Sequence, residues 1–321
     1  MKKFSIITTV IVPLTLFSGC MKNEIINDET GAMEIQFNAE NKTSTRAAIG
    51  SEGFPVGSAF SVWGFMTKDS QTANVFEGNI VTKGTDNSWT CDATRYWFSG
   101  WNYDFYAIHP SGIGSVSSDG VVTVEKFDCS TTGADAKDLM ISSAPGLSYV
   151  PEDGPQPVTL NFNHLLSRID FVGKSVGGSA IVHSVVLSGI NTTANCSASF
   201  TQEGNVNATW TGPTSGSVSS KIDGGVKLEQ LSTTSVVEDM LIIPQTLTDA
   251  AKVTITYSTD AEQNKIAEYN LIIGELNTWE AGKSYRYSFE VTGGGYIIFN
   301  KPTVNTWNSA TGGNVIIDVT Q

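Results

Sequence analysis

The strongest constraint on the fold is a recurring pattern of short apolar runs separated by turn residues. From residue 33 onward, runs rich in Val, Ile, Phe and Tyr alternate with Gly, Ser, Thr and Asn. No long stretch keeps its apolar residues at the 3.6-residue period of an amphipathic helix. This pattern is typical of sandwiches and barrels and predicts an all-β protein. The expected strands include residues 33–40, 59–65, 76–81, 103–108, 121–124, 158–162, 169–172, 181–187, 240–243, 253–257, 266–273 and 285–291.

A stretch rich in Pro, Gly and acidic residues at 145–157 is the candidate boundary between two domains. Without its leader the chain has roughly 300 residues, which suggests about two domains of ordinary size. We therefore expect an N-terminal domain over residues 20–157 and a C-terminal one over residues 158–321. The Gly/Ser/Thr stretch 211–220 is expected to be a long exposed loop.

Residues 1–19 have the layout of a secretory signal peptide. Two lysines precede a mostly apolar run, Phe4 to Phe17, which is shorter than the ~20 residues of a membrane-spanning helix. The run ends in "LFSGC", whose small residues before Cys20 resemble a bacterial lipobox, where cleavage precedes acylation of the cysteine. An ordinary signal peptide with a chance cysteine is the alternative. Lipid on Cys20 would anchor the protein to a membrane without spanning it.

The charge balance excludes one broad class of function. The chain has 19 basic and 32 acidic residues, a formal net charge of −13 at pH 7. Proteins that bind nucleic acids use a basic face. We therefore expect no nucleic-acid partner.

The residues that carry catalytic or metal chemistry form no recognisable site. His109, His164 and His183 have no second His or Cys at a metal-ligand spacing, so each is interpreted as structural. The stretch 173–177 fits G-x-S-x-G, but no helical pattern follows it, as a nucleophile elbow requires. The sequence therefore predicts no enzyme, no cofactor and no metal site.

Three cysteines follow Cys20, and their pairing stays open. Cys91, Cys129 and Cys196 do not have the spacing of a zinc site, and three is an odd number for a disulfide framework. One disulfide and three buried free thiols are both compatible with the sequence.

The clearest single strand precedes a small polar stretch that contains an arginine. Residues 33–40 alternate between apolar and polar without a break, so Met33, Ile35, Phe37 and Ala39 share one face. The stretch "TSTRAAIG" at 43–50 follows and holds one of the four arginines of the chain.

The C-terminal stretch 296–321 repeats the same kind of apolar row. After a strand-like piece at 296–299, Val315, Ile317 and Val319 recur at period 2 and fall on one face of an expected strand. The row has the residue types and the spacing of the first strand.

Aromatic residues gather in "YWFSGWNYDFYAIHP", residues 96–110. Packing in a core is the first interpretation, because aromatic side chains dominate core energetics. A platform for stacking on sugars is the alternative. Trp97 and Trp101 are the members that we expect to be exposed and the candidate glycan contacts.

Several segments together resemble the fimbrillin-like proteins of Bacteroidetes, the subunits of type V pili. They are "YDFYAIHP" (103–110), "VTLNFNHLLSRIDF" (158–171), "DMLIIPQTL" (239–247), "TWEAGKSYRYSFEV" (278–291) and the tail around Trp307. Their order and spacing, from Cys20 onward, carry the resemblance. It implies two transthyretin-like β-sandwich domains with a C-terminal strand appendage.

The resemblance also implies how such a chain matures. The lipoprotein would be exported to the outer membrane and cut between Arg46 and Ala47, which removes the first strand with Met33, Ile35 and Phe37. The C-terminal strands of another subunit would fill the vacated groove. In this chain the donor segment corresponds to residues 296–321, with Val315, Ile317 and Val319 as its apolar row.

The leading hypothesis is therefore a structural subunit of a cell-surface fimbrium that serves adhesion. Its partners would be other pilus subunits, in a homopolymer or a heteropolymer, with a host or bacterial surface as a further candidate ligand. The alternative is an adhesin or glycan-binding lipoprotein, similar to an anchor or a tip, that does not polymerise. A hydrolase with an unrecognised site is the weakest hypothesis.

Overall fold

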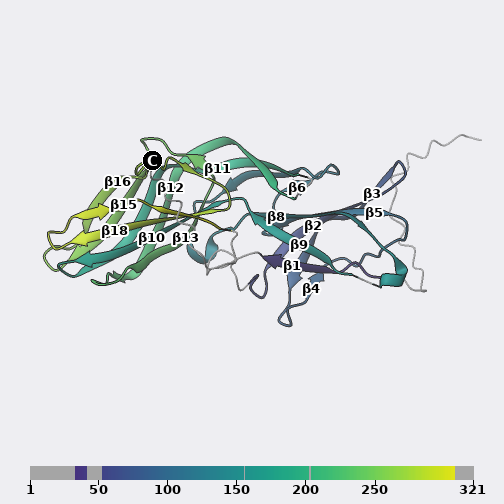
Figure 1. The fold of residues 1–321 in the computed structure, drawn as a ribbon, viewed down its shortest axis with the longest axis horizontal. Coiled ribbons are helices and arrows are strands. Elements are labelled where there is room, and N and C mark those ends of the chain that lie inside the picture. Colours follow the sequence, from purple (N-terminus) through teal and green to yellow (C-terminus); the bar gives the residue numbers. More distant parts are fainter. Residues whose placement is uncertain (1–32, 42–52, 155, 202–203, 308–321) are drawn as a thin grey trace, which may run out of the picture. The chain divides into compact units, whose positions relative to one another are not determined.

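The computed structural model describes residues 33–41, 53–154, 156–201 and 204–307, and the regular secondary structure of these ranges is almost entirely strand (Figure 1). The expected all-β class is confirmed. No helix within the described ranges is long and apolar enough to cross a membrane. The elements are β1 (Phe37–Asn41), β2 (Ala59–Lys68), β3 (Gln71–Lys83), β4 (Trp89–Cys91), β5 (Asn102–His109), β6 (Ser115–Val116), β7 (Val122–Asp128), η1 (Gly133–Asp135), β8 (Met140–Ser148), η2 (Pro151–Asp153), β9 (Val158–His164), β10 (Ser167–Val176), β11 (Ala180–Phe200), β12 (Val206–Lys227), β13 (Thr234–Ile242), β14 (Gln245–Thr246), β15 (Lys252–Thr259), β16 (Lys265–Asn270), β17 (Thr278–Trp279), β18 (Lys283–Thr292), β19 (Ile297–Phe299) and β20 (Thr303–Thr306).

A seven-stranded sheet has the order β1-β9-β8-β5-β2-β3-β4, so β1 and β4 are its two edges. Strand β1 runs parallel to β9, and the other neighbours in this sheet are antiparallel. The expected domain boundary at residue 157 falls immediately before β9, which hydrogen-bonds to β1 and β8. That boundary stays a prediction.

Two further sheets contain most of the remaining strands. One has the order β13-β10-β18-β19, with β20 also paired to β18. The other has the order β16-β15-β11-β7-β6, with β12 along the opposite edge of β11. The 21 residues of β11 pair first with β15 and then with β7, so this strand joins segments far apart in the sequence.

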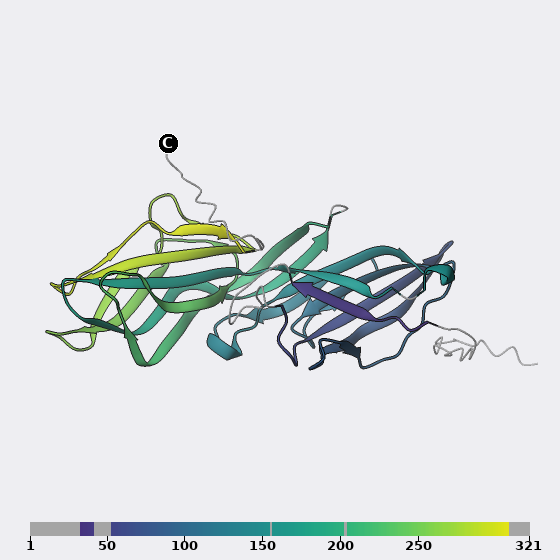
Figure 2. The ribbon, with the colours of Figure 1, turned by 60° about the horizontal axis from the view of Figure 1, so that its bottom comes forward.

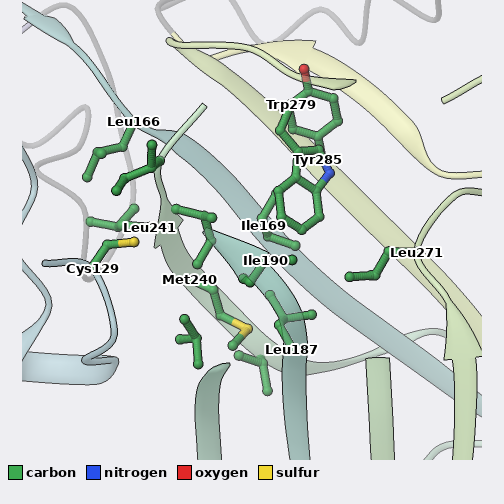
Figure 3. Close-up of a cluster of buried hydrophobic side chains, with 14 of the residues drawn as sticks. Cys129, Leu166, Ile169, Leu187, Ile190, Met240, Leu241, Leu271, Trp279 and Tyr285 are labelled. Carbon is green, nitrogen blue, oxygen red and sulfur yellow. The ribbon is translucent and has the colours of Figure 1, made fainter. Parts of the chain in front are cut away.

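The apolar faces of the strands form two clusters of buried side chains. The larger cluster includes Ile169 of β10, Leu187 and Ile190 of β11, and Met240 of β13, which lie together in Figure 3. The smaller cluster lies in the seven-stranded sheet and is rich in phenylalanine. Because it also includes residues of the first strand, it positions the candidate site described below.

The expectation of a long loop at residues 211–220 is wrong. These residues belong to β12, which pairs antiparallel with β11 from Val206 to Lys227. Most side chains of β12 are exposed and small or polar, so the segment lacks the apolar alternation that marks a half-buried strand. Its partner strand, rather than its own residue preference, determines its conformation.

A buried ionic cluster holds β10 against β13. The Arg168 guanidinium lies 3.0 Å from the Asp170 carboxylate and 2.7 Å from that of Asp239, and each of the three side chains is at most 7% exposed. Asp170 also accepts a hydrogen bond of 3.0 Å from the backbone N–H of Asp239, which has a positive φ of 61°. Asp170 therefore supports both the arginine and an unusual backbone conformation.

We predict that Asp170→Ala destabilises the protein by roughly 3–5 kcal/mol, because it leaves Arg168 buried with less compensating charge. Chemical denaturation measures this change. The control is Lys174→Gln, which breaks the more exposed Lys174–Glu290 pair and should change stability by less than about 1 kcal/mol. Equal effects of the two substitutions would contradict the structural importance of the buried cluster.

Candidate functional site

The first strand lies at an edge of the seven-stranded sheet. Strand β1 pairs with β9 in parallel from Phe37, opposite Val158, to Asn41, opposite Phe162. The Val158 N–H also donates a hydrogen bond of 2.7 Å to the Gln36 carbonyl just before β1. Figure 2 shows β1, in purple, beside β9. Because an edge strand has a sheet neighbour on one side only, β1 can leave without breaking a central ladder.

The residues just before β1 bond to a different segment. The Ile35 N–H donates to the Arg95 carbonyl at 2.8 Å, and the Trp97 N–H donates to the Met33 carbonyl at 2.9 Å. Glu34 and Tyr96 form an antiparallel bridge between these two bonds. The first strand is therefore held by β9 along its second half and by residues 95–97 along its first half.

The side chains of the first strand alternate as the sequence predicts. Ile35 and Phe37 are 3% and 5% exposed, and the partly buried Met33 and Ala39 pack against the same phenylalanine-rich cluster. Glu34, Gln36 and Asn38 are exposed. The predicted burial of one face is confirmed, whereas removal of the strand is not tested by this structure.

Phe37 lies among three other phenylalanine rings. Its ring centroid is 5.3 Å from that of Phe76, 5.8 Å from that of Phe105 and 6.4 Å from that of Phe60, each in an edge-on arrangement. The three rings come from β3, β5 and β2 and are at most 1% exposed. The edge strand thus places an aromatic ring inside the core of the sheet.

A groove of about 530 Å³ lies between β1 and β4. Its lining includes Phe37 and Asn38 on one side and Trp89 and Cys91 on the other. Burial is the main cause that raises the pKa of the Cys91 thiol above its usual value. The groove opens beside the first strand, and its lining residues do not form a convergent set of catalytic groups.

The chain is anchored again soon after the first strand. Phe54 is 2% exposed, and its ring centroid lies 5.3 Å from that of Trp89 and 5.2 Å from that of Phe162. The Lys83 ammonium donates a hydrogen bond of 2.6 Å to the Phe54 carbonyl. Arg46 and Ala47, the expected cleavage positions, lie in the stretch 42–52, outside the described residues. Cys20 also lies outside them.

Part of the expected donor segment belongs to the chain's own sheet. Strands β19 and β20 both pair antiparallel with β18. Trp307 is 4% exposed, its ring stacks on that of His164 at a centroid distance of 3.8 Å, and its backbone N–H donates to the Gly282 carbonyl. Val315, Ile317 and Val319 lie outside the described residues, so their donor role stays a prediction.

The expectation that Trp97 is exposed is wrong. The residue is 7% exposed and its ring centroid lies 4.7 Å from that of Tyr103 and 5.7 Å from that of Phe105, so the ring belongs to the phenylalanine-rich core cluster. Trp101 is half-buried, with the Lys68 ammonium 6.0 Å from its ring centroid. A glycan contact at Trp101 stays a prediction.

Each of the three histidines has a ring nitrogen within hydrogen-bond distance of another residue of the fold. The Nδ1 atom of His109 lies 2.9 Å from the Ala59 carbonyl, and that of His164 lies 3.0 Å from the Asp138 carboxylate. His183 Nε2 lies 2.8 Å from the Ser258 hydroxyl. Burial lowers the pKa of His109 below its usual value. Across the described part of the chain, no group of three His, Cys, Asp or Glu residues could hold a metal ion.

Cys91, Cys129 and Cys196 are free thiols. Burial raises the pKa values of Cys129 and Cys196 to about 12, so both stay protonated at neutral pH. These three cysteines therefore form no disulfide bond that stabilises the fold, and the fold depends on its apolar clusters.

Residues 45–307 match the profile of a protein family described as fimbrillin-like. No curated protein sequence matches the chain. Similar solved structures include a candidate cell adhesion protein from Bacteroides uniformis, with a TM-score of 0.55 at 19% identity, covering 86% of this chain and 98% of the other. A fimbrial protein from Bacteroides vulgatus has a TM-score of 0.53 at 13% identity, covering 85% and 99%. At these identities, the likeness establishes the fold alone.

We predict that Trp307→Ala lowers the free energy of unfolding by about 3–5 kcal/mol, since it removes a buried ring stacked on His164. Thermal and chemical denaturation measure the change. Thr303→Ala, at an exposed position on β20, is the control and should have an effect below about 1 kcal/mol. If Trp307→Ala is as mild as the control, the tail up to Trp307 is not part of the core.

Proposed function

Because the chain belongs to the fimbrillin-like family, we propose that it is a structural subunit of a cell-surface pilus that serves adhesion. In this proposal it is exported as a lipoprotein through Cys20 to the outer membrane. Cleavage between Arg46 and Ala47 then frees the first strand, and a strand from another subunit replaces it. The observation that carries the proposal is an edge strand whose apolar face is buried in the core.

The surface that the first strand covers supplies the driving force for binding a replacement strand. Each large apolar side chain contributes about 1.5–3 kcal/mol when it is buried, so Ile35 and Phe37 together contribute on the order of 3–6 kcal/mol. Their departure would expose the phenylalanine-rich cluster and the unpaired edge of β9. A strand from another chain that covers both surfaces is stabilised by the same contacts, as in pilin donor-strand complementation.

The anchoring of Phe54 explains how the body survives the cut. The contacts of Phe54 with Trp89, Phe162 and Lys83 do not involve the first strand. A break at Arg46 would therefore release the residues before it and leave the new N-terminal segment attached at Phe54.

The folded body restrains the other three arginines, of which Arg168 and Arg286 lie in paired strands and Arg95 lies between strands. The Arg95 guanidinium donates to the Val75 carbonyl at 2.9 Å, and Arg168 lies in the buried ionic cluster. Arg286 lies within β18, which pairs with β10 on one side and with β20 on the other. A protease must draw an extended segment into its active site, which paired strands resist. This protection favours a single cut at Arg46.

The names of the structural neighbours support the same role. They are described as candidate cell adhesion proteins and as a fimbrial protein, and we carry this assignment to the present chain as part of the proposal. The tail after Trp307 is the proposed donor, since the residues up to Trp307 form part of the chain's own core.

The first test uses an arginine-specific endoprotease on the folded precursor. We expect one cut after Arg46, followed by uptake of a labelled peptide of residues 33–41 that the uncut chain does not take up. Mass spectrometry and fluorescence anisotropy measure the two steps. Arg46→Ala and Arg46→Lys should both block cutting and uptake, and the lysine variant shows that loss of charge is not the cause.

Rapid cutting at Arg95 or Arg286 in the folded chain, or resistance of Arg46 to the protease, would contradict the proposed cleavage step. If the uncut chain takes up the peptide as fast as the cut chain does, cleavage is not required for strand exchange.

The second test removes the proposed donor by ending the chain after Asn308. In cells that assemble the pilus, the shortened subunit should still be cut but should shorten the fibres, because it accepts a strand and gives none. Electron microscopy and heat-sensitive ladders on gels measure fibre length. Replacing Val315, Ile317 and Val319 together by Ser should have the same effect, whereas Ile316→Ser, on the opposite face, should not. Fibres of normal length from the shortened subunit would contradict donation by this tail.

A further inference from the structure

We propose that the groove vacated by the first strand selects a replacement strand that carries an aromatic ring at the position of Phe37. The proposed donor residues 308–321 of this chain lack such a ring, so the occupant comes from a different subunit and the pilus is a heteropolymer at this joint. This inference rests on the proposed function, because it concerns the strand that replaces residues 33–41.

The pocket around Phe37 has aromatic walls. Phe60, Phe76 and Phe105 surround the ring at centroid distances of 5.3–6.4 Å and interplanar angles of 66–87°. Edge-on pairs of this kind are stabilised beyond the area that they bury, since the positive ring edge meets the negative ring face. An aliphatic side chain fills part of the volume but makes none of these ring contacts.

The walls of this pocket have little freedom to collapse onto a smaller side chain. All three residues are at most 1% exposed, and the ring centroids of Phe76 and Phe105 lie 6.2 Å apart. The backbone of β2 approaches them closely at Gly64, where an added Cβ would lie 3.0 Å from both Phe76 and Phe105. Packed interiors of this kind retain a void when a large side chain becomes smaller, and the void weakens binding.

Residues 308–321 cannot supply the ring in any register. Residues 308–321 read "NSATGGNVIIDVTQ" and contain no Phe, Tyr or Trp. The preceding aromatic residue, Trp307, is buried against His164, and Phe299 packs on Tyr269 and Phe289. Drawing either ring out would open the chain's own core.

The chemistry of the expected occupant follows from the two buried positions. It is a strand with an aliphatic residue at the Ile35 position, a polar residue next, and an aromatic residue at the Phe37 position. The row Val315, Ile317 and Val319 suits an acceptor whose corresponding pocket is aliphatic. Strand donation and strand acceptance by this chain therefore involve different partner subunits.

The test uses the full chain after cleavage at Arg46 and labelled peptides of residues 33–41. We expect the Phe37→Ile peptide to bind on the order of tenfold more weakly than the native peptide, or worse. The control peptide, Gln36→Ala, changes an exposed residue and should bind within about twofold of the native peptide.

A second set of peptides tests the tail directly. The native 308–321 peptide should bind at least about tenfold more weakly than the native 33–41 peptide. At least one of the variants Val315→Phe, Ile317→Phe and Val319→Phe should recover most of the difference. A Phe37→Ile peptide that binds as tightly as the native one, or a native tail that matches the first strand, overturns the inference.

If no 33–41 peptide binds the cleaved chain, strand removal opens no groove and the proposed function fails. The preference for an aromatic residue at position 37 is then tested in the intact chain, by comparing the melting temperatures of two variants. Phe37→Ile should lower the melting temperature by at least about 3 °C, and Gln36→Ala should leave it nearly unchanged. Equal melting temperatures for the two variants overturn the inference.

Discussion

The contact on which this structure depends is the insertion of Phe37, from an edge strand, into a pocket of phenylalanine rings. Burial of Ile35 and Phe37 contributes on the order of 3–6 kcal/mol, whereas whole domains are stable by only about 5–15 kcal/mol. The first strand therefore accounts for a large share of the stability of its sheet. A chain that lost it without replacement would be marginally stable, so any process that removes the strand must also supply another.

Local patterns predicted the first strand well, because a period-2 alternation by itself shows which side chains share a face of a strand. The polar and apolar residues of 33–39 occupy the two faces that their spacing indicates. The bonds to residues 95–97 and the aromatic walls around Phe37 could not be predicted, since they depend on pairing between distant segments. The error at residues 211–220 has the same origin: β12 is a strand because β11 is beside it. Trp97 was expected to be exposed because its sequence neighbours do not show that its ring packs on Tyr103 and Phe105.

The C-terminal segment divides at Trp307 into a structural part and a part with a different proposed role. Up to that residue, β19, β20 and the stacked tryptophan complete the sheet that contains β18. The sequence suggested one appendage over 296–321, because strand-like residues continue through the whole stretch. An apolar period shows which side chains share a face, but it does not show whether the face belongs to the same chain or to a partner. The buried stack on His164 makes this distinction for the first part.

The order of Cys20, the first strand and Arg46 along the chain gives the proposed cut two consequences at once. Before the cut, the first strand is tethered to its groove, and the short tether holds it at a high effective concentration that a separate strand cannot match. After the cut, the same strand binds as an independent molecule, so a better-fitting or more concentrated competitor replaces it. Because Cys20, the proposed site of lipidation, lies on the same fragment, the anchor would leave with the strand. One peptide bond would therefore control both release from the membrane and access to the groove, without any change in the folded body.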